Sequence, residues 1–72
     1  MNARDWLDEY AEKLGLGRLS TEDFKAVLDL AAEAAHASDR VAAPTACWLA
    51  GKAGVGLDEA IELARQVLET DG

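Results

Sequence analysis

Apolar residues recur at helical spacing in four separate stretches of this 72-residue chain. The first stretch predicts an amphipathic helix over residues 3–14, one face of which carries Trp6, Leu7, Tyr10, Ala11 and Leu14. Asn2 is the predicted N-cap of this helix, and Gly15 suits the left-handed position that follows its last turn. The pattern therefore predicts a helix that ends before the glycine-containing connection over residues 15–19.

The second stretch predicts a helix over residues 21–37, capped by Ser20 or Thr21. Its expected buried face holds six apolar residues: Phe24, Val27, Leu28, Ala31, Ala34 and Ala35. Leu30 lies off this face, so we expect it to touch a different neighbour. The end of the helix is rich in alanine, which lets another helix or a bulky side chain approach closely. Trp48 is the predicted occupant of that space.

The third and fourth stretches predict helices over residues 44–53 and 57–70. Pro44 fits the first position of the third helix, Gly51 is expected to mark close packing within it, and Gly54 is expected to end it. The fourth helix has a clear apolar face of Leu57, Ile61, Ala64, Val67 and Leu68. No stretch alternates with a period of two, so no strand is expected.

Together these elements predict an all-α fold: one compact four-helix domain over residues 1–72. All four apolar faces need burial, so the first and last helices are expected to pack against the central pair. The predicted core consists of Trp6, Leu7, Tyr10, Leu14, Phe24, Leu28, Ala31, Trp48, Leu49, Ile61, Ala64 and Leu68.

Charge narrows the range of binding partners. The chain has a net charge of −7, which disfavours nucleic acids and anionic membrane surfaces as partners. No stretch reaches 18 uncharged apolar residues, and no basic segment precedes an apolar run, so neither a membrane span nor a secretory signal is expected. We therefore expect a cytoplasmic protein whose partner is another protein.

Catalytic and metal-binding motifs are scarce in the sequence. Cys47 is the single cysteine and His36 the single histidine, which excludes an internal disulfide and a structural zinc site. The sequence also lacks a nucleophile elbow, a phosphate-binding glycine loop and the serine motif of a carrier protein. A Cys47–His36 pair across two helices is an alternative, but a lone cysteine on an alanine-rich face is more typical of a small core residue. We expect a protein that is not an enzyme and needs no cofactor or metal.

Polar and special residues concentrate between the second and third helices. The candidate contacts for a partner or an anion are His36, Arg40, Pro44, Thr45 and Trp48. In one interpretation they fasten a helix corner: Arg40 bonds the last carbonyls of the second helix, and Asp39 caps the third helix or pairs with Arg40. In the other, the free N–H groups at Thr45, Ala46 and Cys47 bind a phosphate or a carboxylate beside Arg40.

The same segment carries a family resemblance. Residues 36–54 read HASDRVAAPTACWLAGKAG. This segment looks like the signature of a small helical domain family of actinobacteria, in which a His is followed by an Arg, an Ala-Pro pair, a hydroxylated residue, an aromatic-Leu pair and two glycines. The matching positions are His36, Arg40, Ala43, Pro44, Thr45, Trp48, Leu49, Gly51 and Gly54. Trp48 stands where the family more often has Phe, and Cys47 where Thr or another small residue is common.

The resemblance implies a helical domain whose function is uncharacterised. Similar domains occur alone or as C-terminal extensions of molybdenum cofactor guanylyltransferase, which joins GMP to molybdopterin. The leading hypothesis is accordingly a non-catalytic accessory or protein-interaction domain, associated through the resemblance with molybdenum cofactor biosynthesis. The alternative is a domain that binds a small anion or nucleotide fragment at the Arg40–Thr45 corner. A homodimer is a separate hypothesis, based on apolar residues in connections and helix starts: Leu16, Leu19, Val41, Val55 and Leu57.

Overall fold

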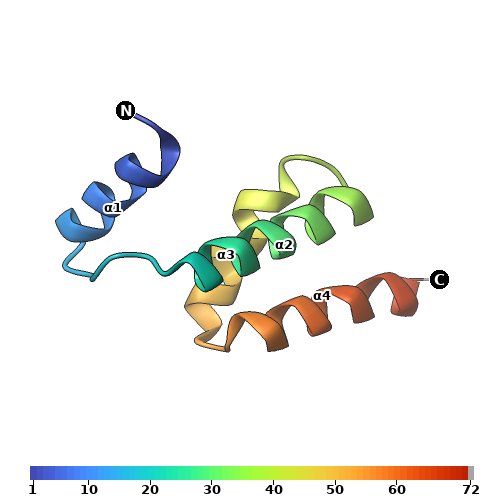
Figure 1. The fold of residues 1–72 in the computed structure, drawn as a ribbon. Helices are drawn as coiled ribbons and strands as arrows, with labels where there is room; N and C mark the ends of the chain where they lie inside the picture. The colour runs from blue at the N-terminus through green and yellow to red at the C-terminus, as the bar shows by residue number, and fades with distance from the viewer. Residues whose placement is uncertain (72) are drawn as a thin grey trace.

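The computed structural model describes the backbone of residues 1–71 and the side chains of residues 1–67. It contains four helices, α1 (Ala3–Lys13), α2 (Thr21–Ala37), α3 (Ala42–Ala53) and α4 (Leu57–Asp71), shown in Figure 1. Residues 1–71 contain no strand. The predicted all-α four-helix fold is therefore confirmed.

Local signals set most of the helix ends. The side chain of Asn2 accepts a hydrogen bond from the N–H of Asp5 at 2.8 Å, and that of Ser20 accepts one from Asp23 at 3.0 Å. Gly15 adopts a left-handed φ of 82°, and the N–H groups of residues 15 and 16 bond back to the carbonyls of Glu12 and Ala11. This arrangement is a Schellman motif, so the predicted start and end of α1 are both confirmed.

The start of α3 differs from the prediction. The helix begins at Ala42 rather than at Pro44, which is its third residue. The chain turns before this point: the N–H groups of Ala42 and Ala43 donate to the carbonyls of Asp39 and Arg40. Proline is still tolerated there, because the N–H groups of a first helical turn have no partner within the helix. Gly54 ends α3 with a left-handed φ of 74°, as predicted.

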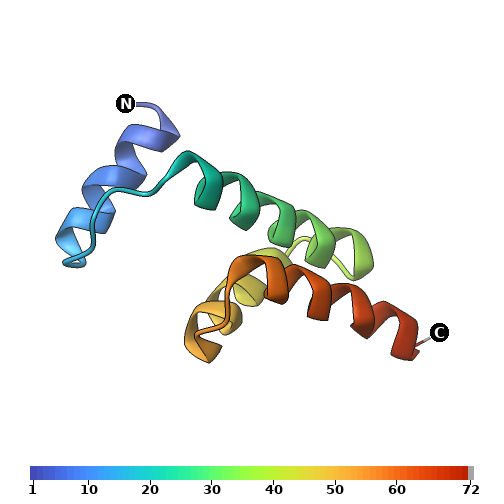
Figure 2. The same cartoon turned by 60° about the horizontal axis from the view of Figure 1, so that its bottom comes forward.

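Three of the four helices form the packed body of the molecule. α2 packs against both α3 and α4. Figures 1 and 2 show α2 and α4 side by side, and α1 standing apart near the start of α2. In Figure 1, α3 crosses behind α2. The prediction that α1 packs against the central helix pair is therefore wrong. An ion pair on the surface, from Arg65 Nε to Glu33 at 3.1 Å, also joins α4 to α2.

The core is small and centres on Leu30, which is 2 % exposed and packs with Ala60 and Ile61. Five half-buried residues surround it: Cys47, Ala50, Val55, Leu57 and Ala64. Of the predicted core, Ile61 is buried, and four residues are half-buried: Leu7, Phe24, Ala31 and Ala64. The prediction is wrong for six exposed residues: Trp6, Tyr10, Leu14, Leu28, Trp48 and Leu49. The side chain of Leu68 lies outside the described residues.

Small side chains explain the orientation of α3. Cys47 faces α2, with its Sγ 3.8 Å from the carbonyl oxygen of Val27, and Ala50 packs on the core. Because α2 and α3 approach across these small residues, the bulkier Trp48 is directed away and is 61 % exposed. Trp48 therefore does not fill the alanine-rich face of α2. Gly51 does not mark close packing either, since a Cβ at that position would meet no atom within 4 Å.

Candidate interaction surfaces

The first candidate surface is the α1 aromatic face, formed by Trp6, Tyr10 and Leu14. These residues are four positions apart, so they follow one another along a single side of the helix. The two aromatic rings stack with centroids 5.1 Å apart and planes inclined by 30°. All three side chains remain about half exposed although they were predicted to lie in the core. The face of α1 that the sequence predicted to be buried is therefore exposed in the structure.

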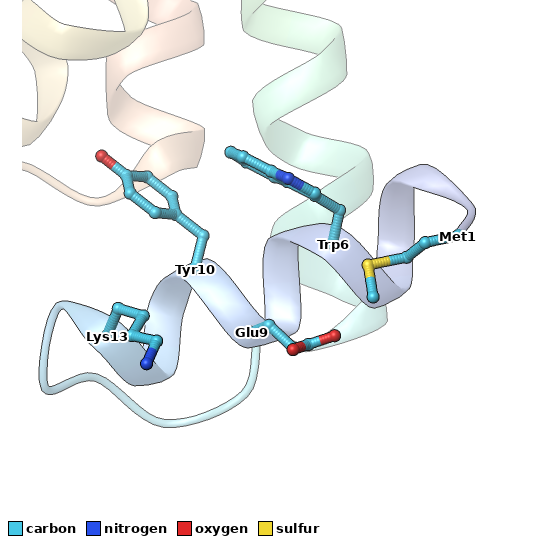
Figure 3. Close-up of a pocket in the computed structure, with 5 residues that line it drawn as sticks. All are labelled: Met1, Trp6, Glu9, Tyr10 and Lys13. Carbon is cyan, nitrogen blue, oxygen red and sulfur yellow. The ribbon is translucent and has the colours of Figure 1, made fainter.

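A hollow of about 350 Å³ lies beside the α1 aromatic face. Figure 3 shows its lining: the two aromatic rings rise from one side of the helix, while the flanking side chains come from Met1, Glu9 and Lys13. An apolar floor edged by charged groups suits a contact that is anchored by aromatic rings and oriented by its polar rim.

Few interactions hold α1 to the rest of the molecule. The guanidinium of Arg4 donates a hydrogen bond to the carbonyl of Leu19 at 2.8 Å and lies 4.7 Å above the ring centre of Phe24. One carboxylate oxygen of Asp8 is buried without a hydrogen-bond partner among the described residues, which opposes the docking of α1. Arg4 is therefore the main anchor between α1 and α2, and it leaves the α1 aromatic face uncovered.

The second candidate surface is an apolar depression of about 370 Å³, which we term the α3–α4 groove. Leu30 of α2 and five alanines line its floor: Ala46, Ala50, Ala53, Ala60 and Ala64. Three larger exposed side chains stand at its rim: Leu49, Leu63 and Val67. The alanines recur at spacings of three or four residues along each helix, so the floor is a direct result of the sequence. The sequence analysis did not find this surface: of the residues that line it, only Leu49 and Ala64 were predicted to lie in the core.

The predicted corner between α2 and α3 is a third surface. Its five candidate residues, His36, Arg40, Pro44, Thr45 and Trp48, are all exposed. Among the described residues, no hydrogen bond, ion pair or ring contact joins any two of their side chains. The hydroxyl of Thr45 instead donates a hydrogen bond to the carbonyl of Val41 at 3.3 Å. The ammonium of Lys52 lies over the ring of Trp48, 5.3 Å from the ring centre.

Hydrogen bonds at this corner differ from both interpretations of the sequence. The carboxylate of Asp39 accepts a hydrogen bond from the N–H of Val41 at 2.9 Å, in the turn before α3. The N-cap of α3 is Val41 and has no side-chain capping bond, so Asp39 neither caps the helix nor pairs with Arg40 in the described residues. The side chain of Arg40 makes no hydrogen bond within the described part of the chain, so it does not fasten the end of α2. Because α3 begins at Ala42, the N–H groups of Ala46 and Cys47 lie beyond its first turn, where they bond within the helix rather than to an anion.

The environment of Cys47 favours an unreactive thiol. Its side chain is half-buried between α3 and α2, and this burial raises the pKa of the thiol above its ordinary value. The Sγ donor lies against the carbonyl of Val27, and no hydrogen bond joins Cys47 to His36 in the described residues. A raised pKa reduces the thiolate form, which is the nucleophile. Cys47 acts here as a packing residue.

The predicted dimer patch is not assembled as expected. Leu16 and Val41 are exposed, but Val55 and Leu57 pack against the core. Leu19 is half-buried, and its carbonyl accepts a hydrogen bond from Arg4.

In the described residues no group of three or more His, Cys, Asp or Glu side chains is arranged to hold a metal ion. None of the helices there has the length and apolar character that crossing a bilayer requires.

The fold and these surfaces define a small all-α domain with exposed apolar faces. The family model for a domain of unknown function, DUF6457, matches residues 1–71, so the chain belongs to this family. Neither a comparison with curated proteins nor one with solved structures found a match.

Proposed function

We propose that this domain is a non-catalytic protein-interaction module, and that its α1 aromatic face docks into an apolar groove of a partner protein. The observation that carries the proposal is the stacked Trp6–Tyr10 pair, whose rings stay half exposed on a helix anchored mainly by Arg4. Tryptophan and tyrosine are the side chains most enriched among residues that dominate binding energy. Their spacing with Leu14 matches the anchors of a helix that binds in a groove.

The charge of α1 indicates the chemistry of the partner. The helix carries four acidic residues, Asp5, Asp8, Glu9 and Glu12, against two basic ones, Arg4 and Lys13. An interface is favoured when opposite charges surround its apolar centre, because like charges that face each other cost several kcal/mol. We therefore expect the partner to present an apolar groove with a basic rim. The chain's net charge of −7 disfavours a polyanion in this role.

The family resemblance supplies the first partner to test. Domains that resemble residues 36–54 occur as extensions of molybdenum cofactor guanylyltransferase, so we propose an enzyme of molybdenum cofactor biosynthesis as the partner. A non-catalytic role is supported by the raised pKa of the Cys47 thiol, whose Sγ lies against the carbonyl of Val27 and makes no hydrogen bond to the single histidine in the described residues. It is also supported by the corner residues, whose side chains are not joined to one another by a hydrogen bond, ion pair or ring contact in the described part of the chain.

The test compares two exposed tryptophans on different surfaces. Trp6 is 54 % exposed on α1 and Trp48 is 61 % exposed on α3, so Trp48→Ala is a matched control for Trp6→Ala. Binding to purified guanylyltransferase from the same organism is measured by titration calorimetry. We expect Trp6→Ala to raise the dissociation constant about 30-fold or more, the effect of losing a dominant contact, while Trp48→Ala binds like the parent protein.

A second arm tests the surface independently of the partner's identity. Proteins captured from a lysate of the organism by the parent are compared with those captured by the two variants. A specific partner should be recovered with the parent and with Trp48→Ala, and lost with Trp6→Ala. If neither the purified enzyme nor any captured protein distinguishes Trp6→Ala from Trp48→Ala, the α1 aromatic face is not the binding surface and the proposal fails.

A further inference from the structure

The chain exposes more surface than a folded monomer of its mass. Its accessible surface is 5684 Å², whereas folded monomers of 7.7 kDa expose about 4,300 Å². The difference of roughly 1,350 Å² exceeds the ~800 Å² that each partner contributes to a stable interface of standard size. The molecule therefore has enough uncovered surface to form a dimer through one helix face and to keep another face free.

The shape of the α3–α4 groove is self-complementary. The large side chains of Leu49, Leu63 and Val67 project at its rim, and alanines form its floor. A two-fold axis places the same patch on both subunits, so each rim can enter the floor of the other copy. Side chains that interdigitate in this way recover the close packing typical of protein interiors. A surface that carries both the projections and the matching depression fits a second copy of itself.

Charge also favours this face for contact between two copies. All ten residues that line the groove are apolar, whereas the chain as a whole carries a net charge of −7. Lys52, the one charged side chain of α3, lies over the ring of Trp48 and does not line the groove. Like charges that face each other across an interface cost several kcal/mol, so two copies of an acidic chain associate best through an uncharged face.

We propose that two copies of this chain associate about a two-fold axis by burying the α3–α4 groove. Leu63 and Val67 of each copy pack over the alanine floor of the other, and Leu49 closes the edge. The dimer leaves the α1 aromatic face exposed on both subunits. The inference does not depend on the proposed function, because it involves different helices and is tested with the purified protein alone.

The experiment measures the molar mass of the parent protein by sedimentation equilibrium across concentrations up to about 500 μM. We expect the mass to rise from 7.7 kDa to twice that value, with a dissociation constant below about 100 μM. Added salt should strengthen association, because like charges on the two copies repel and about 0.5 M NaCl screens them. A mass that stays at that of one chain at every concentration and salt overturns the proposal.

Two variants locate the interface. Leu63 is 48 % exposed at the groove rim, and Leu14 is about equally exposed on α1, so Leu14→Asp is the matched control for Leu63→Asp. We expect Leu63→Asp to raise the dissociation constant at least 100-fold, since it places a carboxylate against an apolar floor, and Leu14→Asp to leave the constant unchanged. Equal effects of the two variants would overturn the assignment.

A third variant covers the case in which Leu63→Asp fails to fold. Ala53 is exposed at the end of α3 within the groove, where a basic residue suits the last turn of the helix. Ala53→Arg should therefore keep the helical circular dichroism of the parent while its long side chain blocks the floor. A folded Ala53→Arg protein that still dimerises like the parent contradicts the proposal.

Discussion

Replacing Leu30 with alanine tests whether the core is where the structure places it. Leu30 is 2 % exposed, the smallest exposed fraction among the three buried core residues. Burial of a leucine contributes about 1.5–3 kcal/mol, and the cavity left by truncation brings the usual cost to about 2–5 kcal/mol. A 72-residue domain has a free energy of unfolding of about 4–11 kcal/mol. At the middle of both ranges, Leu30→Ala should therefore remove about half of the stability.

Leu28 on the same helix provides the matched control. It is 52 % exposed, so truncation to alanine gives up only about half of the transfer free energy of a leucine, about 1 kcal/mol, and leaves no enclosed cavity. The two substitutions remove the same atoms and change helix propensity equally. Their difference therefore reports the burial of the two positions. The spacing of apolar residues along α2 alone predicts the reverse order of stability loss, with Leu28 on the buried face and Leu30 off it.

Urea unfolding followed by circular dichroism at the helical band measures both variants. With a slope of about 1 kcal/mol per molar urea for so small a domain, Leu30→Ala should lower the midpoint by about 2 M or more and Leu28→Ala by about 1 M or less. The measurement is repeated at several protein concentrations, because Leu30 also borders the α3–α4 groove. A midpoint for Leu28→Ala at or below that of Leu30→Ala would refute the orientation of α2.

Three further predictions concern other positions. Gly51→Ala should raise the free energy of unfolding by about 0.5–1 kcal/mol in thermal melts, because the site is helical and open, whereas Gly54→Ala should lower it because of its φ of 74°. Burial raises the pKa of Cys47 in the folded state, so its contribution to stability is full below the unfolded thiol pKa and is lost as the pH rises through the folded pKa. The melting temperature should accordingly fall less at alkaline pH in Cys47→Ala than in the parent. Arg40→Ala should change stability by under about 0.5 kcal/mol, and phosphate at constant ionic strength should shift the midpoints of parent and variant equally, since the Arg40 side chain is exposed and makes no hydrogen bond or ion pair within the described residues.

Helix positions could be predicted from sequence because they depend on local chemistry. Asn2 and Ser20 cap their helices by accepting N–H groups three residues ahead, and Gly15 and Gly54 take the left-handed conformation that ends a helix. Each signal acts within four residues along the chain. The error at α3 has a local cause too: Pro44 fits the first turn at more than one position, and the Asp39 turn fixes the start two residues earlier.

The packing of the helices could not be predicted in the same way. On α2 the predicted stripe contains three alanines, which give little preference for one rotation of the helix over another. Contacts with α3 and α4 decide the rotation, and they place Leu30 inside and Leu28 outside. Trp48 was misplaced for a related reason: its size suggested a core residue, but the close approach of α3 to α2 leaves room there only for residues as small as Cys47.

Binding surfaces and core faces give the same signal in a sequence. The periodic spacing of Trp6, Tyr10 and Leu14 indicates one apolar face on α1, and the pattern does not state whether that face is covered by the same chain. The predicted corner had the opposite difficulty. His36 and Arg40 stand out by residue type, yet neither side chain makes a hydrogen bond or ion pair within the described chain. Only the arrangement of helices shows which apolar faces lack a neighbour.

The distribution of side-chain size links the packing of this domain to its proposed role. The helices approach across alanines and Cys47, whereas both tryptophans and the tyrosine remain about half exposed. Small interior residues bury little apolar area each, which limits the stability of the isolated chain. Large exposed residues represent apolar area that association can still bury. Truncating an exposed aromatic should thus affect binding far more than folding, and truncating Leu30 should affect folding first.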